Sequence, residues 1–257
     1  MKKQLISIDL NDFPKELHSY FKGATVYDSS CYSSAIVYYL DTGYYLKVDE
    51  VGRLYEEAKL NRLFYNSGFG VEVISYISLD KDYLLTRSAI GNDCTHFLDT
   101  PEKLCQVMAN TLLKLHSSSW DGFPISSRMQ RFGEAARGDI SSGEFDSHVL
   151  LRCFQINSLE EAWDIMQENV DKLKFDTLIH GDYCLPNIIL NDGKFSSLID
   201  FNMSGVGDKH IDLYWAIWSL EYNLKSDKYT DYFLDLYGRD NFDYDMLRVI
   251  AAFEVFG

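Results

Sequence analysis

Apolar and polar residues alternate in short blocks over the first third of the chain. Four blocks rich in tyrosine, valine, isoleucine and leucine predict strands at residues 35–40, 44–48, 71–76 and 83–86. The turn Asp41-Thr42-Gly43 joins the first two strands as a hairpin. Between residues 51 and 66 the apolar positions recur near the helical period, and Asn66-Ser67-Gly68 ends the pattern. The order is therefore strand, strand, helix, strand, strand.

The pattern changes to a mainly helical one after residue 92. Helices are predicted at about residues 101–116, 159–173, 211–223 and 243–253, with short strands at 187–190 and 195–199. Residues 119–147 hold many glycine, serine and charged residues and predict an irregular excursion. The sequence therefore predicts an α+β protein with two lobes. Residues 1–88 form a small β-rich N-lobe with one main helix, residues 89–257 form a larger, mostly helical C-lobe, and residues 86–92 connect them.

The charge of the chain excludes some classes of partner. The 257 residues carry 24 Lys and Arg against 39 Asp and Glu, a net charge of −15. Such a field repels nucleic-acid phosphates and anionic membranes and attracts cations. On charge alone, a surface that simply favours solubility is the preferred explanation of this excess.

The five cysteines and the N-terminus indicate the cellular compartment in which we expect the protein. The cysteines are odd in number, dispersed, and without C-x-x-C spacing, so we expect neither a disulfide framework nor a zinc site. The apolar run at residues 5–8 is too short for a signal peptide, and no segment approaches the length of a membrane span. A reducing cytoplasm is the location that fits these features best.

The densest candidate chemistry lies between residues 180 and 200. Asn187 follows Asp182 after five residues, and Asp200 follows Asn187 after thirteen, with apolar strands on both sides. Phosphoryl-transfer enzymes use these residue types together: one aspartate accepts or orients the proton of the hydroxyl, and an asparagine and a second aspartate hold magnesium. Magnesium needs few protein ligands because it keeps several waters.

The sequence of this region resembles that of the aminoglycoside phosphotransferase family, and most of all that of its 3′-hydroxyl branch. The matching segments are His180-Gly181-Asp182, Cys184-Leu185-Pro186-Asn187, Ile199-Asp200 and the stretch from Ser204 to Asp212. The resemblance implies a protein-kinase-like bilobal fold. It also implies Asp182 as catalytic base, Asn187 and Asp200 as magnesium ligands, and ATP or GTP as the phosphoryl donor.

The same resemblance places the nucleotide site in the N-lobe. Lys47 would neutralise nucleotide phosphates and pair with Glu57, although the ten-residue separation is short and Glu56 is a second candidate. Tyr45 lies two residues before Lys47, so both share one strand face, and it would stack on the base. Two further contacts are expected from Ser33, in a loop without glycine, and Ser88, in the segment between the lobes.

The resemblance implies only some of the residues of the acceptor pocket. Aminoglycosides carry several ammonium groups, so carboxylates should line their site. The resemblance points to Glu254 and Phe256 near the C-terminus, with Glu221 as a further contact. Met203 and Trp218, however, stand where the 3′-branch usually carries arginines.

Two alternatives therefore stay open. The chain is a kinase of another small alcohol, such as a different sugar, choline or a peptide antibiotic, or it is a nucleotide-binding protein without catalytic activity. The leading hypothesis is phosphorylation of an aminoglycoside hydroxyl, which confers antibiotic resistance. A monomer and a dimer are equally compatible with the sequence.

Overall fold

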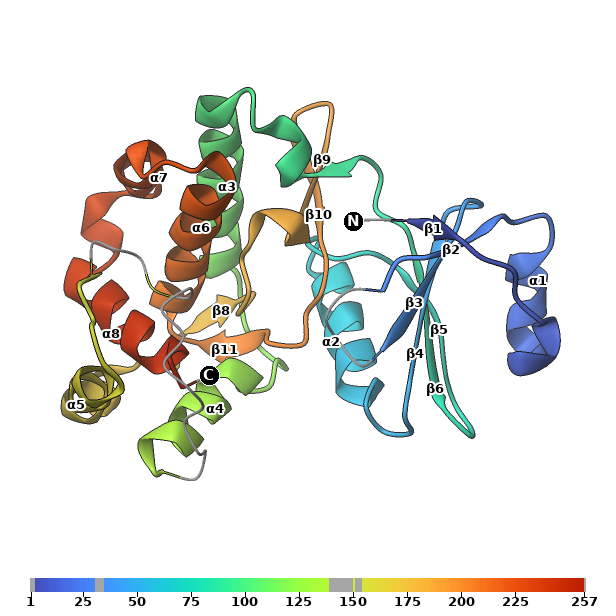
Figure 1. The fold of residues 1–257 in the computed structure, drawn as a ribbon, viewed down its shortest axis with the longest axis horizontal. Coiled ribbons are helices and arrows are strands. Elements are labelled where there is room, and N and C mark those ends of the chain that lie inside the picture. Colours follow the sequence, from blue (N-terminus) through green and yellow to red (C-terminus); the bar gives the residue numbers. More distant parts are fainter. Residues whose placement is uncertain (1–2, 31–34, 139–149, 151–153, 257) are drawn as a thin grey trace. The chain divides into compact units, whose positions relative to one another are not determined.

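Residues 3–30, 35–138, 150 and 154–256 are described by the computed structural model. The chain divides into two units, Met1–Ile90 and Gly91–Gly257 (Figure 1). The sequence predicts this division after residue 88. The roles assigned to the two lobes, nucleotide binding in the first and catalysis in the second, remain predictions.

The first unit contains one antiparallel sheet whose strand order is β1-β2-β3-β4-β6-β5. In that order the strands are β1 (Gln4–Leu5), β2 (Val26–Asp28), β3 (Ile36–Leu40), β4 (Tyr44–Asp49), β6 (Asp82–Arg87) and β5 (Val73–Ser78). The predicted hairpin is present as β3 and β4, with Tyr39 opposite Tyr45. The second predicted pair is present as β5 and β6. The β-rich part of the prediction is thus confirmed.

Helices cover both faces of this sheet (Figure 1). On one face, Leu46 and Leu85 pack in a cluster with Phe21 of the short helix α1 (His18–Phe21). On the other face, Leu84 packs against Ala58 of α2 (Tyr55–Asn66). Because side chains alternate along a strand, the sheet contributes to two separate apolar clusters.

The second unit is mostly helical. Its helices are α3 (Pro101–His116), α4 (Ser127–Ala136), α5 (Leu159–Asn169), α6 (Lys209–Leu224), α7 (Lys228–Tyr237) and α8 (Tyr244–Glu254). Its strands are β7 (Asn92–Asp93), β8 (Thr177–Ile179), β9 (Ile188–Asn191), β10 (Lys194–Leu198) and β11 (Gly205–Gly207), which form the small sheets β10-β9-β7 and β11-β8. α6 packs against α3, α7 and α8. Within the described part of the chain, no helix is long and apolar enough to cross a membrane.

Two helices depart from the sequence analysis. Residues 119–147 are wrongly predicted as irregular throughout, because α4 lies within them and buries Met129 and Phe132. Gly133 and the neighbouring charges mask the helical spacing of these two side chains. The sequence analysis also assigned no element to α7, whose Phe233 and Leu234 are buried. In both cases burial against other helices outweighs a weak local signal.

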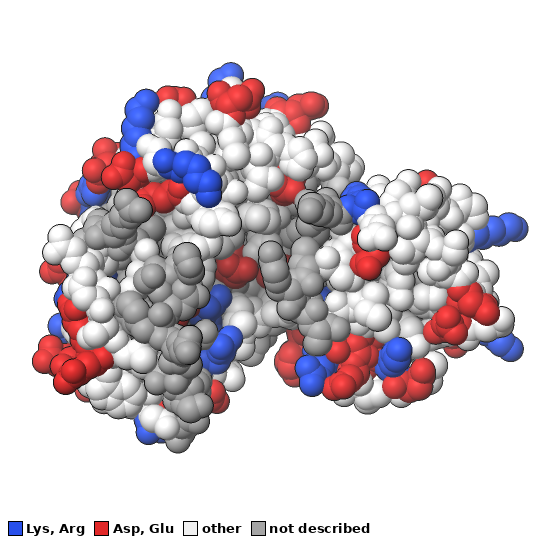
Figure 2. Space-filling view, viewed as in Figure 1, with Lys and Arg blue, Asp and Glu red and all other residues white. Residues whose placement is uncertain are grey.

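Acidic side chains are dispersed on the face shown in Figure 2. In each unit, Asp and Glu side chains lie in several separate groups, and Lys and Arg side chains lie among them. On this face the negative excess is therefore spread over the surface and not collected in one acidic patch.

The contact between α4 and α8 gives a test of the packing. Phe132 is fully buried, and its ring stacks on Phe253 with 4.7 Å between centroids. Phe132→Ala should lower the free energy of unfolding by about 3–5 kcal/mol, because it removes this contact and leaves a cavity. Phe175→Ala is the control, since Phe175 is 51% exposed, and should change it by less than about 0.5 kcal/mol. Equal losses in urea denaturation would contradict this packing.

Candidate functional site

One buried carboxylate fixes the turn that precedes Asp182. Asp212, on the first turns of α6, has no exposed surface. Its Oδ2 accepts the backbone N–H of His180 at 2.8 Å, and its Oδ1 accepts that of Gly181 at 2.7 Å. His116 at the end of α3 adds a contact from Nε2 to Oδ2 at 3.1 Å. The Asp212 carboxylate thereby connects the end of β8 with the helices α6 and α3.

The turn itself requires glycine. Gly181 has φ of +81°, a region that residues with a Cβ rarely adopt. A Cβ at this position would lie 2.1 Å from the carbonyl oxygen of Met203. His180 is buried beside it, with Nε2 3.0 Å from the carbonyl oxygen of Ile199. His180 therefore connects this turn to the residue that precedes Asp200.

Asp182 and Asn187 are brought into direct contact. The Nδ2 of Asn187 donates to Asp182 Oδ2 at 2.9 Å and to the Asp182 backbone carbonyl at 3.0 Å. Between them, the backbone N–H of Leu185 donates to Ser219 Oγ on α6 at 2.9 Å. The five-residue spacing in the sequence thus closes a short loop, and both side chains are half-buried in it.

Asp200 lies next to this loop. The backbone N–H of Ile199 donates to the carbonyl of Asn187 at 3.0 Å, which places the following residue, Asp200, beside the asparagine. Asp200 is exposed and has φ of +64°. Its Oδ1 accepts a hydrogen bond from Asn202 at 3.3 Å.

The oxygen atoms of this loop fit a magnesium ion. Because the amide nitrogen of Asn187 donates to Asp182, the amide oxygen is the side-chain atom that can ligate a cation. Asp200 supplies an exposed carboxylate, and magnesium prefers such oxygens with waters completing its shell. Within the described ranges no cluster of three or more His, Cys, Asp or Glu could hold a metal. A cation here would therefore depend on nucleotide and water oxygens as well.

In the first unit, Lys47 forms an ion pair with Glu57, the partner that the sequence analysis expected for it. Lys47 Nζ lies 2.9 Å from Oε1 and 2.8 Å from Oε2 of Glu57. Seven residues separate the end of β4 at Asp49 from Glu57, on the first turn of α2, so the short spacing is sufficient. Glu56 is exposed and instead lies 3.6 Å from Lys59.

Of the other predicted nucleotide contacts, the structure describes Tyr45 and Ser88. Tyr45 shares the sheet face of Lys47 and lies against Tyr39, with 4.9 Å between ring centroids. The backbone N–H of Ser88 donates to the Gly43 carbonyl at 3.0 Å, so a purine contact from Ser88 would use its carbonyl or hydroxyl. Ser33 lies outside the described residues.

Glu254, the expected acceptor contact, lies in a buried ion pair. Its Oε2 is 2.7 Å from Arg128 Nη1 on α4, and its Oε1 accepts the indole N–H of Trp215 at 2.8 Å. Burial raises the pKa of the Glu254 carboxyl, while Arg128 and Trp215 act in the opposite direction. Arg128 Nε also donates to the Gly181 carbonyl at 3.1 Å. Glu254 is therefore linked to the residue that precedes Asp182.

The sequence analysis missed Arg128 and the part played by Trp215. Arg128 lies in the segment predicted to be irregular, and its partner is 126 residues away. An arginine beside the apolar positions of α4 was the available signal, because a buried arginine requires an ionic partner.

The two remaining acceptor candidates have contacts within the second unit. Phe256 is buried, and its ring meets Trp163 edge-on with 5.9 Å between centroids. Glu221 accepts a hydrogen bond from Thr230 Oγ1 of α7 at 2.7 Å. Burial raises the pKa of Glu221, and the Thr230 hydroxyl partly offsets this.

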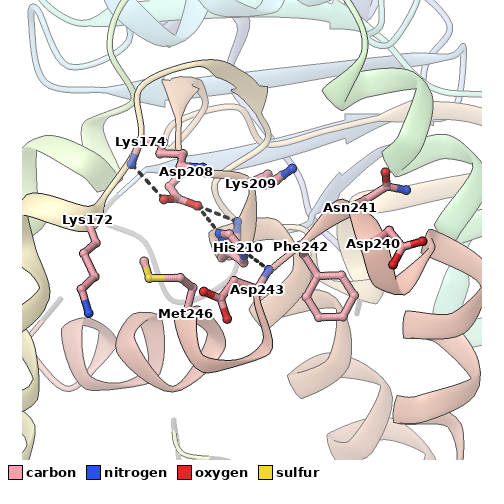
Figure 3. Close-up of a pocket in the computed structure, with 10 residues that line it drawn as sticks. All are labelled: Lys172, Lys174, Asp208, Lys209, His210, Asp240, Asn241, Phe242, Asp243 and Met246. Carbon is pink, nitrogen blue, oxygen red and sulfur yellow. Dashed lines mark hydrogen bonds and ion pairs between the residues drawn. The ribbon is translucent and has the colours of Figure 1, made fainter.

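A separate cavity adjoins the N-terminus of α6 (Figure 3). Asp208 accepts the backbone N–H of Lys174 at 2.9 Å and contacts His210 Nδ1 at 2.5 Å, while His210 Nε2 accepts the N–H of Asp243 at 2.9 Å. Burial opposes ionisation of Asp208, but the hydrogen bonds from His210 and from the backbone of Lys174 lower its pKa overall. These groups brace α6, which carries Asp212.

Gly181 provides a test of this loop with a matched control. Gly181 and the exposed Gly122 share φ of +81°, but a Cβ at Gly122 would meet nothing within 4 Å. Gly122→Ala should cost about 1 kcal/mol of folding stability from backbone strain. Gly181→Ala should cost at least about 2 kcal/mol more, because the loop must move away from Met203. Similar losses for both variants in urea denaturation would contradict the close approach.

Comparison with known proteins shows which family this chain resembles. Residues 29–250 match the model of the phosphotransferase enzyme family. A protein of Lactococcus lactis, named as a probable aminoglycoside 3′-phosphotransferase, is 38% identical over 98% of this chain and 98% of its own length. An aminoglycoside 3′-phosphotransferase of Niallia circulans is 29% identical over 68% of this chain and 67% of its own length.

Solved structures show the same fold. An aminoglycoside 3′-phosphotransferase of type VIII has a TM-score of 0.70 at 20% identity and covers 96% of this chain and 99% of its own. A Streptomyces rimosus enzyme, in complex with ADP and streptomycin, has a TM-score of 0.66 at 18% identity, with 97% and 99% covered. These likenesses confirm the predicted α+β, kinase-like fold. Together with the family match and the 38% identical relative, they show that this chain belongs to the phosphotransferase enzyme family.

Proposed function

We propose that this chain transfers the γ-phosphoryl group of ATP or GTP to the 3′-hydroxyl of an aminoglycoside and so confers resistance. The observation that carries the proposal is the hydrogen-bonded pair of Asp182 and Asn187 on a loop held by Asp212. The names of the relatives support the acceptor, since proteins 38% and 29% identical are named as 3′-phosphotransferases of aminoglycosides.

Asp182 is the proposed catalytic base. Its carboxylate accepts the proton of the attacking hydroxyl, and the amide of Asn187 holds it in one orientation at 2.9 Å. Since the turn at Gly181 is fixed by Asp212, the carboxylate is positioned before the acceptor binds. Positioning and electrostatics supply most of the rate enhancement in phosphoryl transfer.

Lys47 is the proposed phosphate contact. Glu57 binds its ammonium through both carboxylate oxygens, which fixes the direction of a flexible side chain. Tyr45 is the proposed stacking surface for the base, and Ser33 and Ser88 are further proposed contacts. Solved relatives in complex with ADP and with AMP-PNP support a nucleotide as the donor.

Magnesium is the proposed metal. Asn187 and Asp200 would hold it, and when bound it would neutralise charge on the transferred phosphoryl group. We also propose that the enzyme works in the cytoplasm, where ribosomes, the targets of aminoglycosides, are found.

We propose that the acceptor site prefers cationic molecules. The net charge of −15 attracts a polyamine over long range. Glu254, Phe256 and Glu221 remain proposed contacts. Because Glu254 already binds Arg128 at 2.7 Å, an ammonium of the acceptor would have to share that carboxylate with the guanidinium.

The second candidate is a kinase of another small alcohol. It is favoured by Met203 and Trp218, which stand where the 3′-branch usually carries arginines. A protein without catalytic activity is disfavoured, because Lys47, Asp182, Asn187 and Asp200 are all present.

Turnover assays with ATP separate these functions. Kanamycin should be phosphorylated, while its 3′-deoxy analogue should not, because it lacks the accepting hydroxyl. Asp182→Asn should lower kcat at least about 100-fold and leave nucleotide affinity nearly unchanged, since removal of a general base acts on the chemical step. Equal turnover of both acceptors would overturn the regiochemistry, and activity on non-aminoglycoside alcohols alone would favour the second candidate.

Salt should weaken acceptor binding. Raising ionic strength from 0.1 to 1 M shortens the screening length from about 10 to about 3 Å, so the KM for kanamycin should rise. An acceptor with some of its amines acetylated should show a smaller rise, because it carries fewer charges. A KM independent of salt would show that the negative charge of the protein serves solubility and not recognition.

A further inference from the structure

The first unit contains a buried carboxylate that binds two different elements. Asp82, the first residue of β6, has no exposed surface. Its Oδ1 accepts the hydroxyl of Ser78 on β5 at 2.7 Å, and its Oδ2 accepts the backbone N–H of Leu54 at 2.9 Å. One oxygen therefore serves the hairpin of β5 and β6, and the other serves the residue directly before α2.

This carboxylate closes the connection between β4 and α2. Asp82 pairs with Asp49, the last residue of β4. The chain then leaves the sheet and returns to Asp82 at Leu54, whose carbonyl accepts the N–H of Ala58 in α2 at 2.9 Å. The backbone N–H of Gly52, within the connection, also donates to Asp82. Both ends of the connection are thus held at one residue of β6.

The hydrogen bonds keep Asp82 charged. Burial opposes its ionisation, but hydrogen bonds from two side chains and two backbone N–H groups lower its pKa overall. A negative charge is favourable beside the N-terminus of a helix, because the first backbone N–H groups have no partners within the helix. The anion therefore stabilises the start of α2 by its charge as well as by the bond to Leu54.

The two elements joined by this connection carry the proposed phosphate contact and its partner. Lys47 lies on β4, and Glu57 lies on the first turn of α2, three residues after Leu54. The side chains of Lys47 and Glu57 are only 17% and 7% exposed, so their geometry depends on the elements that hold them. Leu54 and Ala58 pack with Leu84 of β6 in one apolar cluster. A shift of this turn would therefore move Glu57 relative to Lys47.

We infer that Asp82 is a positioning residue for nucleotide binding: it fixes the first turn of α2 against β6, so that Glu57 directs the ammonium of Lys47 toward the nucleotide phosphates. The inference rests on the proposed function, which assigns Lys47 to those phosphates. Asp82 acts through Glu57 and is not itself a nucleotide contact. In the sequence it follows Asp80 and Lys81 in a polar turn, so its burial is what distinguishes it.

Calorimetric titration with MgATP tests this role, with MgGTP in its place if the wild type binds that nucleotide more tightly. Asp82→Ala should raise the nucleotide Kd about 5- to 30-fold, because Leu54 loses its partner and the first turn of α2 is released. Ser78→Ala is the matched control. It removes the bond to Oδ1 and keeps the bond from Leu54 to Oδ2, so the Kd should stay within about twofold of the wild type. An equal rise in both variants would overturn the inference.

A double-mutant cycle separates positioning from a general loss of structure. Glu57→Gln alone should weaken nucleotide binding, because it removes the charge that holds Lys47. If Asp82 acts through Glu57, adding Asp82→Ala to Glu57→Gln should raise the Kd by less than about twofold more. Factors that multiply in the double variant would show independent effects and overturn the inference. If Asp82→Ala does not fold, Asp82→Ser takes its place in both experiments, since its hydroxyl is too short to reach the N–H of Leu54.

Binding and turnover together distinguish a failure of this inference from a failure of the proposed function. If the wild type binds nucleotide but does not phosphorylate kanamycin, the proposed function fails, and weaker nucleotide binding by Asp82→Ala would still support the role of Asp82. If the wild type phosphorylates kanamycin and Asp82→Ala binds nucleotide as tightly as the wild type, the inference is overturned and the function stands. A wild type that binds neither MgATP nor MgGTP would overturn both.

Discussion

The second unit depends on the buried carboxylate of Asp212. A carboxylate without water is costly unless hydrogen bonds compensate it, and here the backbone N–H groups of His180 and Gly181 do so together with His116. Those same bonds satisfy amides that would otherwise be unpaired at a sharp turn. Since Asp212 belongs to α6, this helix is fixed relative to the loop that carries Asp182. The position of the proposed catalytic base therefore depends on this interaction.

The distribution of charge gives the net value of −15 a more specific meaning. On the face in Figure 2 the acidic groups are dispersed, which suits long-range attraction of a cation rather than a single binding patch. At short range, the carboxylate of Glu254 is paired with Arg128, an internal cation. Under the proposed function, an ammonium group of the acceptor would have to share Glu254 with this guanidinium.

The sequence predicted what is encoded locally. The spacing of Asp182 and Asn187 marked both as site residues, and the structure shows them in contact. Lys47 was assigned its partner Glu57. The pair of Arg128 and Glu254 was not predictable in this way, because it joins two helices distant in sequence. α4 and α7 were missed for the same reason: their apolar faces are defined by the helices they pack against. In the sheet of the first unit, the strands β3 to β6 were predicted from their strong period of two, whereas the short strands β1 and β2 were not.

The central claim concerns one bond, from phosphorus to the 3′-oxygen of an aminoglycoside. Proton–phosphorus correlation NMR of the product formed from kanamycin and ATP tests it most directly. The account predicts a single product in which the phosphorus couples to the proton on the 3′-carbon. Coupling to a proton on any other carbon, or the absence of a phosphorylated product, would contradict it.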